Sequence, residues 1–135
     1  MNYPKEAIKE LTKLLDGDVK AIDWLVDKGY RDLVIAGSGI CGNEDAVGAL
    51  KKEKKPVLAA FVETVNGDKN AFKWLTTNKH YTWAATANAA LKDKGAMKWL
   101  IKFKLDHLAE LSAAIKRRHK KNDDEETGAI YKLPR

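Results

Sequence analysis

The side chains that could carry chemistry are few and widely separated in this sequence. The three histidines, His80, His107 and His119, have no metal-ligand spacing with one another or with the single cysteine, Cys41, and neither an HExxH sequence nor a pair of cysteines occurs. Cys41 would act as a nucleophile only with an activating base beside it, and we favour an inert thiol near a helix end. We therefore predict no catalytic residue, no metal site and no cofactor.

Two short clusters also suggest sites and have plainer interpretations. Asp106, His107 and Glu110 fall close together on one expected helix, where a polar exposed turn explains them as well as a catalytic or metal role does. The segment 37–39, GSG, resembles part of a phosphate loop, but no GxxxxGK[ST] sequence follows it. Small residues that allow close helix packing are the better interpretation of this segment.

The elements that would position any site form a repeat of 25 residues. GDKNAFKWL, from Gly67 to Leu75, returns at that interval as GDVKAIDWL, GNEDAVGAL and KDKGAMKWL. The shared columns are Ala21, Ala46, Ala71 and Ala96, then Leu25, Leu50, Leu75 and Leu100, with tryptophan at Trp24, Trp74 and Trp99. Self-similarity at one fixed period indicates a repeat array.

Each period predicts two short helices. The first helix follows a good N-cap residue at position 18, 43, 68 or 93, and in three copies a glycine precedes it that can end the previous helix in a left-handed conformation. The second helices are expected near Arg31–Cys41, Pro56–Asn66, Tyr81–Leu91 and Leu105–Lys116. Their columns of small side chains predict a tightly packed inner row, and the tryptophans of the first helices are expected on the packed face.

We therefore predict an all-α solenoid of about nine short helices, made of a half repeat plus four helix-hairpin repeats of 25 residues. The repeats are expected near 17–41, 42–66, 67–91 and 92–116, with 4–16 as an N-terminal capping helix, so that the helical-repeat domain spans 1–116. Units of such an array touch mainly their neighbours. Residues 117–135 are predicted to be a charged, solvated C-terminal tail, because Gly128 and Pro134 argue against a further helix.

The composition restricts the class of protein. A chain of 135 residues is about one domain, and 44% hydrophobic with 33% charged residues indicates an ordered chain. No apolar run approaches the roughly 20 residues needed to cross a bilayer, so we expect no membrane partner. A single cysteine fits a reducing compartment, and we expect a cytoplasmic location.

Part of the repeat is similar to a known family. The segment GDVKAIDWLVDKG, Gly17 to Gly29, resembles the second helix of an ankyrin repeat, and KPVLAA at 55–60 resembles the start of that family's first helix. The first copy lacks the proline, no copy has the family's histidine, and 25 residues leave no room for its β-hairpin loop. The resemblance implies an ankyrin-like helical solenoid that recognises a partner protein, and it identifies no binding residue.

The charge of the chain changes sign along its length. Residues 1–50 carry six basic and nine acidic side chains, whereas residues 92–121 carry ten basic and three acidic, within a net charge of +6. Two columns on one flank of the first helices turn from acidic to basic: Asp23, Gly48, Lys73 and Lys98, and then Asp27, Lys52, Thr77 and Lys102. The candidate partner-binding residues are Lys52, Lys73, Lys98, Lys102 and Lys104.

This basic flank has three interpretations: a solvated face, a contact with an acidic protein, or a contact with the nucleic-acid backbone. Phosphate contacts would show a steep loss of affinity with salt, and sequence-specific reading is not expected because no aromatic residues are interleaved on the same face. We predict a non-enzymatic protein-interaction or scaffold module that binds a partner through its repeat surface. Nucleic-acid backbone binding through the basic C-terminal half is the alternative.

Overall fold

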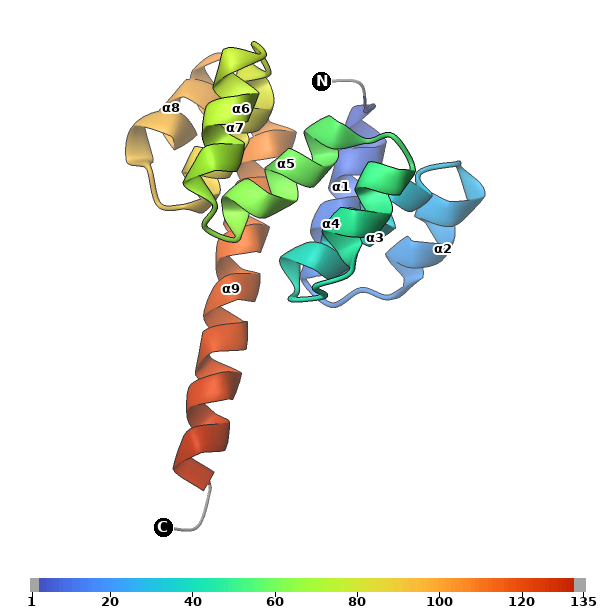
Figure 1. Ribbon diagram of the computed structural model, residues 1–135, viewed down its shortest axis with the longest axis vertical. Coiled ribbons are helices and arrows are strands. Elements are labelled where there is room, and N and C mark those ends of the chain that lie inside the picture. Colours follow the sequence, from blue (N-terminus) through green and yellow to red (C-terminus); the bar gives the residue numbers. More distant parts are fainter. Residues whose placement is uncertain (1–2, 133–135) are drawn as a thin grey trace.

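The computed structural model describes the backbone of residues 3–132 and the side chains of residues 3–122. Within residues 3–132 the regular structure is helical, without a strand, which confirms the predicted all-α helical repeat (Figure 1). The inner helices are α1 (Lys5–Leu15), α3 (Arg31–Ile40), α5 (Pro56–Val65), α7 (Tyr81–Ala90) and α9 (Asp106–Lys132). The outer helices are α2 (Lys20–Asp27), α4 (Ala46–Lys52), α6 (Lys69–Thr77) and α8 (Lys94–Lys102).

The turns between the helices repeat as regularly as the helices do. Both kinds of turn contain one residue with a left-handed backbone, at φ values between 58° and 111°. The residues after the inner helices are Gly17, Gly42, Gly67 and Lys92, and those after the outer helices are Gly29, Lys54, Lys79 and Lys104. The three glycines that were predicted to end the inner helices do so, and four lysines adopt a conformation that favours glycine.

The polar residues that were predicted to start the outer helices all accept backbone hydrogen bonds. The Asp68 side chain accepts from the N–H groups two and three residues on, at 2.8 and 3.2 Å, and the Asp93 side chain accepts from the one three residues on, at 3.2 Å. Asp18 and Asn43 each accept from the N–H group two residues on, at 3.0 Å. In these two copies the helix begins two or three residues after the polar residue.

Small side chains let the inner helices approach closely, as predicted. Gly37 and Gly39 are buried in α3. A Cβ atom on Gly39 would lie 2.8 Å from Cγ1 of Val62 in α5 and 3.0 Å from the Cβ of Ala46 in α4. The GSG segment is thus part of a helix and serves helix packing, which confirms the interpretation preferred over a phosphate loop.

The prediction that the repeated tryptophans lie in the packed core is wrong for two of the three. Trp74 is 39% exposed and Trp99 is 37% exposed, while Trp24 is half-buried. The outer helices are covered mainly on the side that faces the inner helices, and the alanine and leucine columns occupy that side. Trp83, in the inner helix α7, is buried as predicted.

The array closes on itself, which corrects the prediction that units touch mainly their neighbours. Helix α1 packs against α9, so that the inner helices contact one another in the closed order α1, α3, α5, α7, α9. Arg117 of α9 donates two hydrogen bonds to the Asp16 carboxylate, at 3.0 and 3.1 Å. No outer helix precedes α1 within residues 3–132, and its buried Ile8 and Leu11 are covered by the other end of the array instead.

Helix α9 continues through Lys132, so the helix end expected near Lys116 is wrong (Figure 1). The side chains of His119 and Asn122 reach the carbonyl oxygens of Ile40 and Cys41, at 3.2 and 3.4 Å. These are terminal carbonyls of α3, which have no partner within their own helix. The start of the predicted solvated tail is therefore helical and in contact with the bundle. The glycine at position 128 falls inside α9 because glycine costs a helix only about 1 kcal/mol, and position 134 lies outside the described residues.

Candidate functional site

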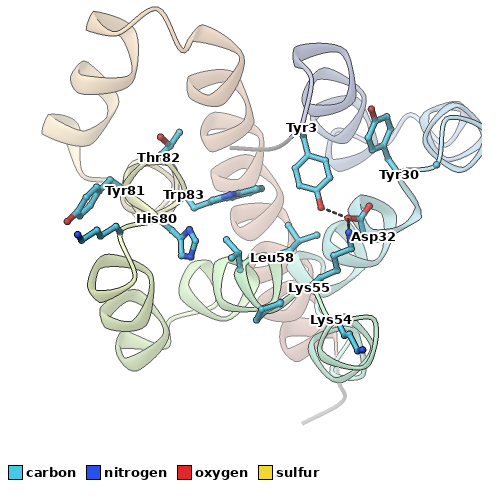
Figure 2. A pocket seen from close by; sticks show the side chains of 14 residues that line it. Tyr3, Tyr30, Asp32, Lys54, Lys55, Leu58, His80, Tyr81, Thr82 and Trp83 are labelled. Carbon is cyan, nitrogen blue, oxygen red and sulfur yellow. Dashed lines mark hydrogen bonds and ion pairs between the residues drawn. The ribbon is translucent and has the colours of Figure 1, made fainter.

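A cleft of about 560 Å³ lies where the inner helices α3, α5 and α7 begin. Its walls come from three consecutive repeats, and Tyr3, from the segment before α1, completes them. Figure 2 shows the Tyr3 hydroxyl pointing toward Asp32, while the Tyr3 ring packs edge-on against Trp83 with ring centroids 6.0 Å apart. Leu58 and His80 also line the cleft. The closed fold thus brings together side chains that are far apart in the sequence.

The helix starts at this cleft have no side-chain caps. Tyr30, Lys55 and His80 each stand directly before an inner helix, and within the described part of the chain none of them caps its helix with a side-chain hydrogen bond. The first N–H groups of an α-helix have no partner inside the helix, and the helix dipole gives this end a partial positive charge. In α3 the Leu33 N–H already donates to the Asp32 carboxylate, and α5 begins with Pro56, which has no N–H. The N–H groups that remain without a described partner at these helix starts favour an anion in the cleft.

Lysine side chains add full positive charges to these partial ones. Lys54, Lys55 and Lys79 line the cleft. The Lys55 ammonium lies 3.6 Å from the Asp32 carboxylate, whereas Lys54 and Lys79 form no ion pair with any described residue. Two lysines at the cleft are therefore without an ion-pair partner among the described residues.

The buried carboxylate of Asp32 is held on the cleft wall by its neighbours. Asp32 is 8% exposed; it accepts hydrogen bonds from the Tyr3 hydroxyl and, at 3.0 Å, from the N–H group of Leu33. Burial raises the pKa of Tyr3 far above its usual value, and the hydrogen bond to Asp32 and the charge of that carboxylate raise it further. The phenol therefore stays protonated at neutral pH and fixes the wall instead of acting as a base.

Two of the three tryptophans on the outer helices, Trp24 and Trp74, pack against residues of the cleft wall. Trp24 stacks on Tyr30, with ring centroids 6.3 Å apart and 12° between the planes. Trp74 stacks on His80 in the same way, at 5.6 Å and 22°. Both pairs join an outer helix to the residue directly before the next inner helix, six positions on in the sequence. This role accounts for two of the repeated tryptophans, whereas Trp99 packs on Phe103, outside the cleft.

The five predicted partner-binding lysines do not line the cleft. Four are exposed on the outer helices α4, α6 and α8, and one is exposed in the turn after α8. They are Lys52, Lys73, Lys98 and Lys102 on the helices, and Lys104 in the turn. Within the described residues the outer helices do not pack extensively against one another. A role for these lysines as partner contacts stays a prediction.

The lysines that do line the cleft were not among the residues predicted from the sequence. Their spacing carries a signal, because Lys54 and Lys79 occupy the same repeat position, and so do Lys55 and His80. That spacing places each pair in equivalent turns. It does not show that the turns face a common space, which depends on the angle between successive hairpins.

The three histidines and Cys41 are not brought together, whereas Asp106, His107 and Glu110 are neighbours at the start of α9. His80 lies in the cleft wall, His107 at the start of α9, and His119 beside the end of α3. Cys41 is the C-cap residue of α3, near a helix end as predicted. Among the residues whose side chains are described, no three His, Cys, Asp or Glu side chains form a group that could hold a metal ion.

The fold and the site define an all-α helical-repeat protein with a positively charged cleft at one end of its inner helices. None of the helices between residues 3 and 132 combines the length and apolar character that a bilayer crossing requires. No protein-family model, curated protein or solved structure matches the chain.

Proposed function

We propose that this protein is a non-enzymatic interaction module that binds an acidic segment of a partner protein in the cleft at the start of α3, α5 and α7. The observation that carries this proposal is the meeting of two lysines without ion pairs, Lys54 and Lys79, with three helix starts whose N-cap residues form no side-chain cap. Carboxylate groups are stabilised both by helix N-termini and by ammonium groups.

The cleft lining favours a peptide segment over a lone inorganic anion. The rings of Tyr30, His80 and Tyr81 lie among the lysines, so a bound segment can pack apolar atoms on rings while its carboxylates reach ammonium groups. Two of these rings are stacked on tryptophans and already ordered, which lowers the entropy lost on binding.

Two expectations from the sequence agree with this proposal. The resemblance of the repeat to ankyrin repeats implies protein recognition, which is the usual activity of that family. We place this activity in the cytoplasm, because the single cysteine fits a reducing compartment.

The proposal is tested by fluorescence anisotropy with a short labelled peptide that is rich in glutamate and has one central tyrosine. Lys54→Gln/Lys79→Gln removes two charges and replaces each lysine with a polar, uncharged side chain that is one atom shorter. Hydrogen bonds to charged groups contribute about 1.5–3 kcal/mol each, and about 1.4 kcal/mol corresponds to tenfold in affinity. We therefore expect the double variant to bind at least about tenfold more weakly.

The matched control is Lys9→Gln/Lys69→Gln, which removes two charges from exposed positions on α1 and α6 outside the cleft. Its affinity for the peptide is expected to stay within about twofold, because distant exposed charges are screened by salt. Equal losses from the two double variants, or no binding by the unaltered protein, would contradict the proposal.

Nucleic-acid backbone binding is a second candidate function, which the exposure of Lys98, Lys102 and Lys104 favours. Titration of random duplex DNA in rising salt tests it, because phosphate contacts make the logarithm of the affinity fall linearly with the logarithm of the salt concentration. Lys98→Gln/Lys102→Gln is expected to weaken such DNA binding and to leave peptide binding in the cleft unchanged. DNA binding that this variant does not weaken would exclude a role for these two lysines.

A further inference from the structure

The outer helices at the two ends of the array carry opposite charges on equivalent exposed faces. In α2 two aspartates flank an exposed valine, and in α8 two lysines flank an exposed isoleucine. The residues are Asp23, Val26 and Asp27 in α2, and Lys98, Ile101 and Lys102 in α8. Each residue of the first set is three repeats before its counterpart in the second. The two faces therefore carry an aliphatic side chain and two charged side chains at the same helix positions, with charges of opposite sign.

The middle outer helices do not share this pattern. The position of Val26 and Ile101 is occupied by Lys51 in α4 and by Thr76 in α6. Val26 is 48% exposed and Ile101 is 55% exposed. Among the described outer helices, a large aliphatic side chain thus stands in the middle of a like-charged face only on the first, α2, and the last, α8.

More exposed apolar surface lies beside each of these faces. Val19, one turn before Asp23, is 70% exposed at the start of α2. Phe103, at the end of α8, is 53% exposed, and the Lys102 ammonium lies 5.7 Å from its ring centroid. Exposed apolar groups rimmed by charge are typical of interaction surfaces.

The charges on both faces are available to a partner. Asp23, Asp27, Lys98 and Lys102 form no ion pair within the part of the chain whose side chains are described. Figure 1 shows α8 and α2 on opposite sides of the molecule, so the two faces cannot satisfy each other within one chain.

We propose that α2 of one copy docks on α8 of a second copy, so that the chain associates head to tail. Two α2 faces would place aspartates against aspartates and two α8 faces would place lysines against lysines, so a symmetric pair through one face is disfavoured. A contact between two different faces leaves one face free at each end of the assembly. Further copies can therefore bind there until a ring closes or a filament forms. The apolar residues, Val26 and Ile101, meet at the centre of this contact, and the charge pairs surround them.

Charge exchange tests this arrangement in the full chain by sedimentation equilibrium at low ionic strength. The unaltered protein is expected to exceed the mass of one chain as its concentration rises, and to return to one chain when salt is added. Asp23→Lys/Asp27→Lys and Lys98→Asp/Lys102→Asp are each expected to remain single chains. A mixture of these two variants is expected to associate again, because each new face then meets its opposite. The variant with all four changes is expected to associate by itself.

The control for charge alone is Lys69→Asp/Lys73→Asp on α6, which changes the net charge by the same amount as the α8 variant and should leave association intact. Circular dichroism shows whether each variant is folded. An unaltered protein that stays a single chain at every concentration overturns the proposal. So does a mixture of folded charge-exchange variants that fails to associate. Lys54→Gln/Lys79→Gln is expected to associate like the unaltered protein, so failure of the cleft proposal and failure of this one are separate results.

Discussion

Replacing Gly39 by alanine is expected to destabilise the protein, whereas the same change at Gly48 is expected to stabilise it. Both glycines lie within helices, α3 and α4, so each change brings up to about 1 kcal/mol from helix propensity. Their surroundings differ. A Cβ on Gly48 would have no described neighbour within 4 Å, whereas a Cβ on Gly39 would lie 2.8 Å from Val62 Cγ1 and 3.0 Å from Ala46 Cβ.

The contacts at Gly39 are difficult to relieve. The Cβ of Ala46 moves only with the backbone of α4, and Val62 belongs to a residue type with one strongly preferred χ1 rotamer in a helix. Overpacking of a core costs about 1–3 kcal/mol. After the propensity gain, Gly39→Ala is expected to lose up to about 2 kcal/mol and Gly48→Ala to gain about 1 kcal/mol. The two variants should therefore differ by about 1–3 kcal/mol.

Urea and thermal unfolding followed by circular dichroism measure this difference. For a domain of this size a change of 1 kcal/mol shifts the Tm by about 4 °C, so the two variants should be clearly separated. A Gly39→Ala variant that is as stable as Gly48→Ala would refute the reasoning. It would mean that α3 does not approach α4 and α5 as closely as the glycine contacts indicate.

Three further changes test other parts of the fold. Leu75→Asp is expected to unfold the array, because Leu75 is fully buried and a buried charge without a partner costs several kcal/mol or more. Lys73→Glu, at an exposed position, should change the free energy of unfolding by no more than about 0.5 kcal/mol. Equal loss of thermal stability in the two variants would contradict the assignment of Leu75 to the buried face of α6 and Lys73 to its exposed face. Lys92→Gly is expected to raise the free energy of unfolding by about 1 kcal/mol, because Lys92 has a φ of 74°, and a Tm that does not rise would show that this turn stores no strain. Burial lowers the pKa of His107, and the charges of two lysines in α1 lower it further, although two acidic neighbours raise it. The unfolded chain then binds this proton at higher pH than the folded chain does, so stability should fall as the pH drops through about 6.5. In thermal melts at a series of pH values, His107→Gln should show a smaller loss of stability at low pH than the unaltered protein. An unchanged dependence of stability on pH would argue against a lowered pKa of His107.

The helix boundaries were largely predictable from the 25-residue period. Helices α3, α5 and α7 begin at the predicted residues Arg31, Pro56 and Tyr81, and each ends one residue before the predicted end. Caps and left-handed turns are local features, which recur at the same repeat positions, so the period carries them. Burial of the leucine column and of Ala21, Ala46 and Ala71 was predictable for the same reason, while Ala96 is only partly buried.

The closed arrangement and the cleft were not predictable in this way. The period defines the repeat unit. The angle between successive units depends on how closely each pair of inner helices packs, as at the contact of Gly39 with Val62. The contact of α1 with α9 results from several such angles taken together. The contact of His119 with α3 depends on that closed shape, so sequence spacing alone could not predict it. The exposure of Trp74 has a different cause, because the outer helices are covered mainly on the side that faces the inner helices.

The contact between α1 and α9, called the seam below, closes the array and so fixes the number of helix hairpins it can hold. In an open array, an extra unit adds the same neighbour contacts as any other, so duplication within the gene can lengthen the protein step by step. Here an inserted hairpin would force α1 away from α9 and expose the apolar side chains that cover each other across the seam. Growth by one repeat would therefore carry a large penalty, and we expect the repeat count to resist expansion even where individual residues change freely.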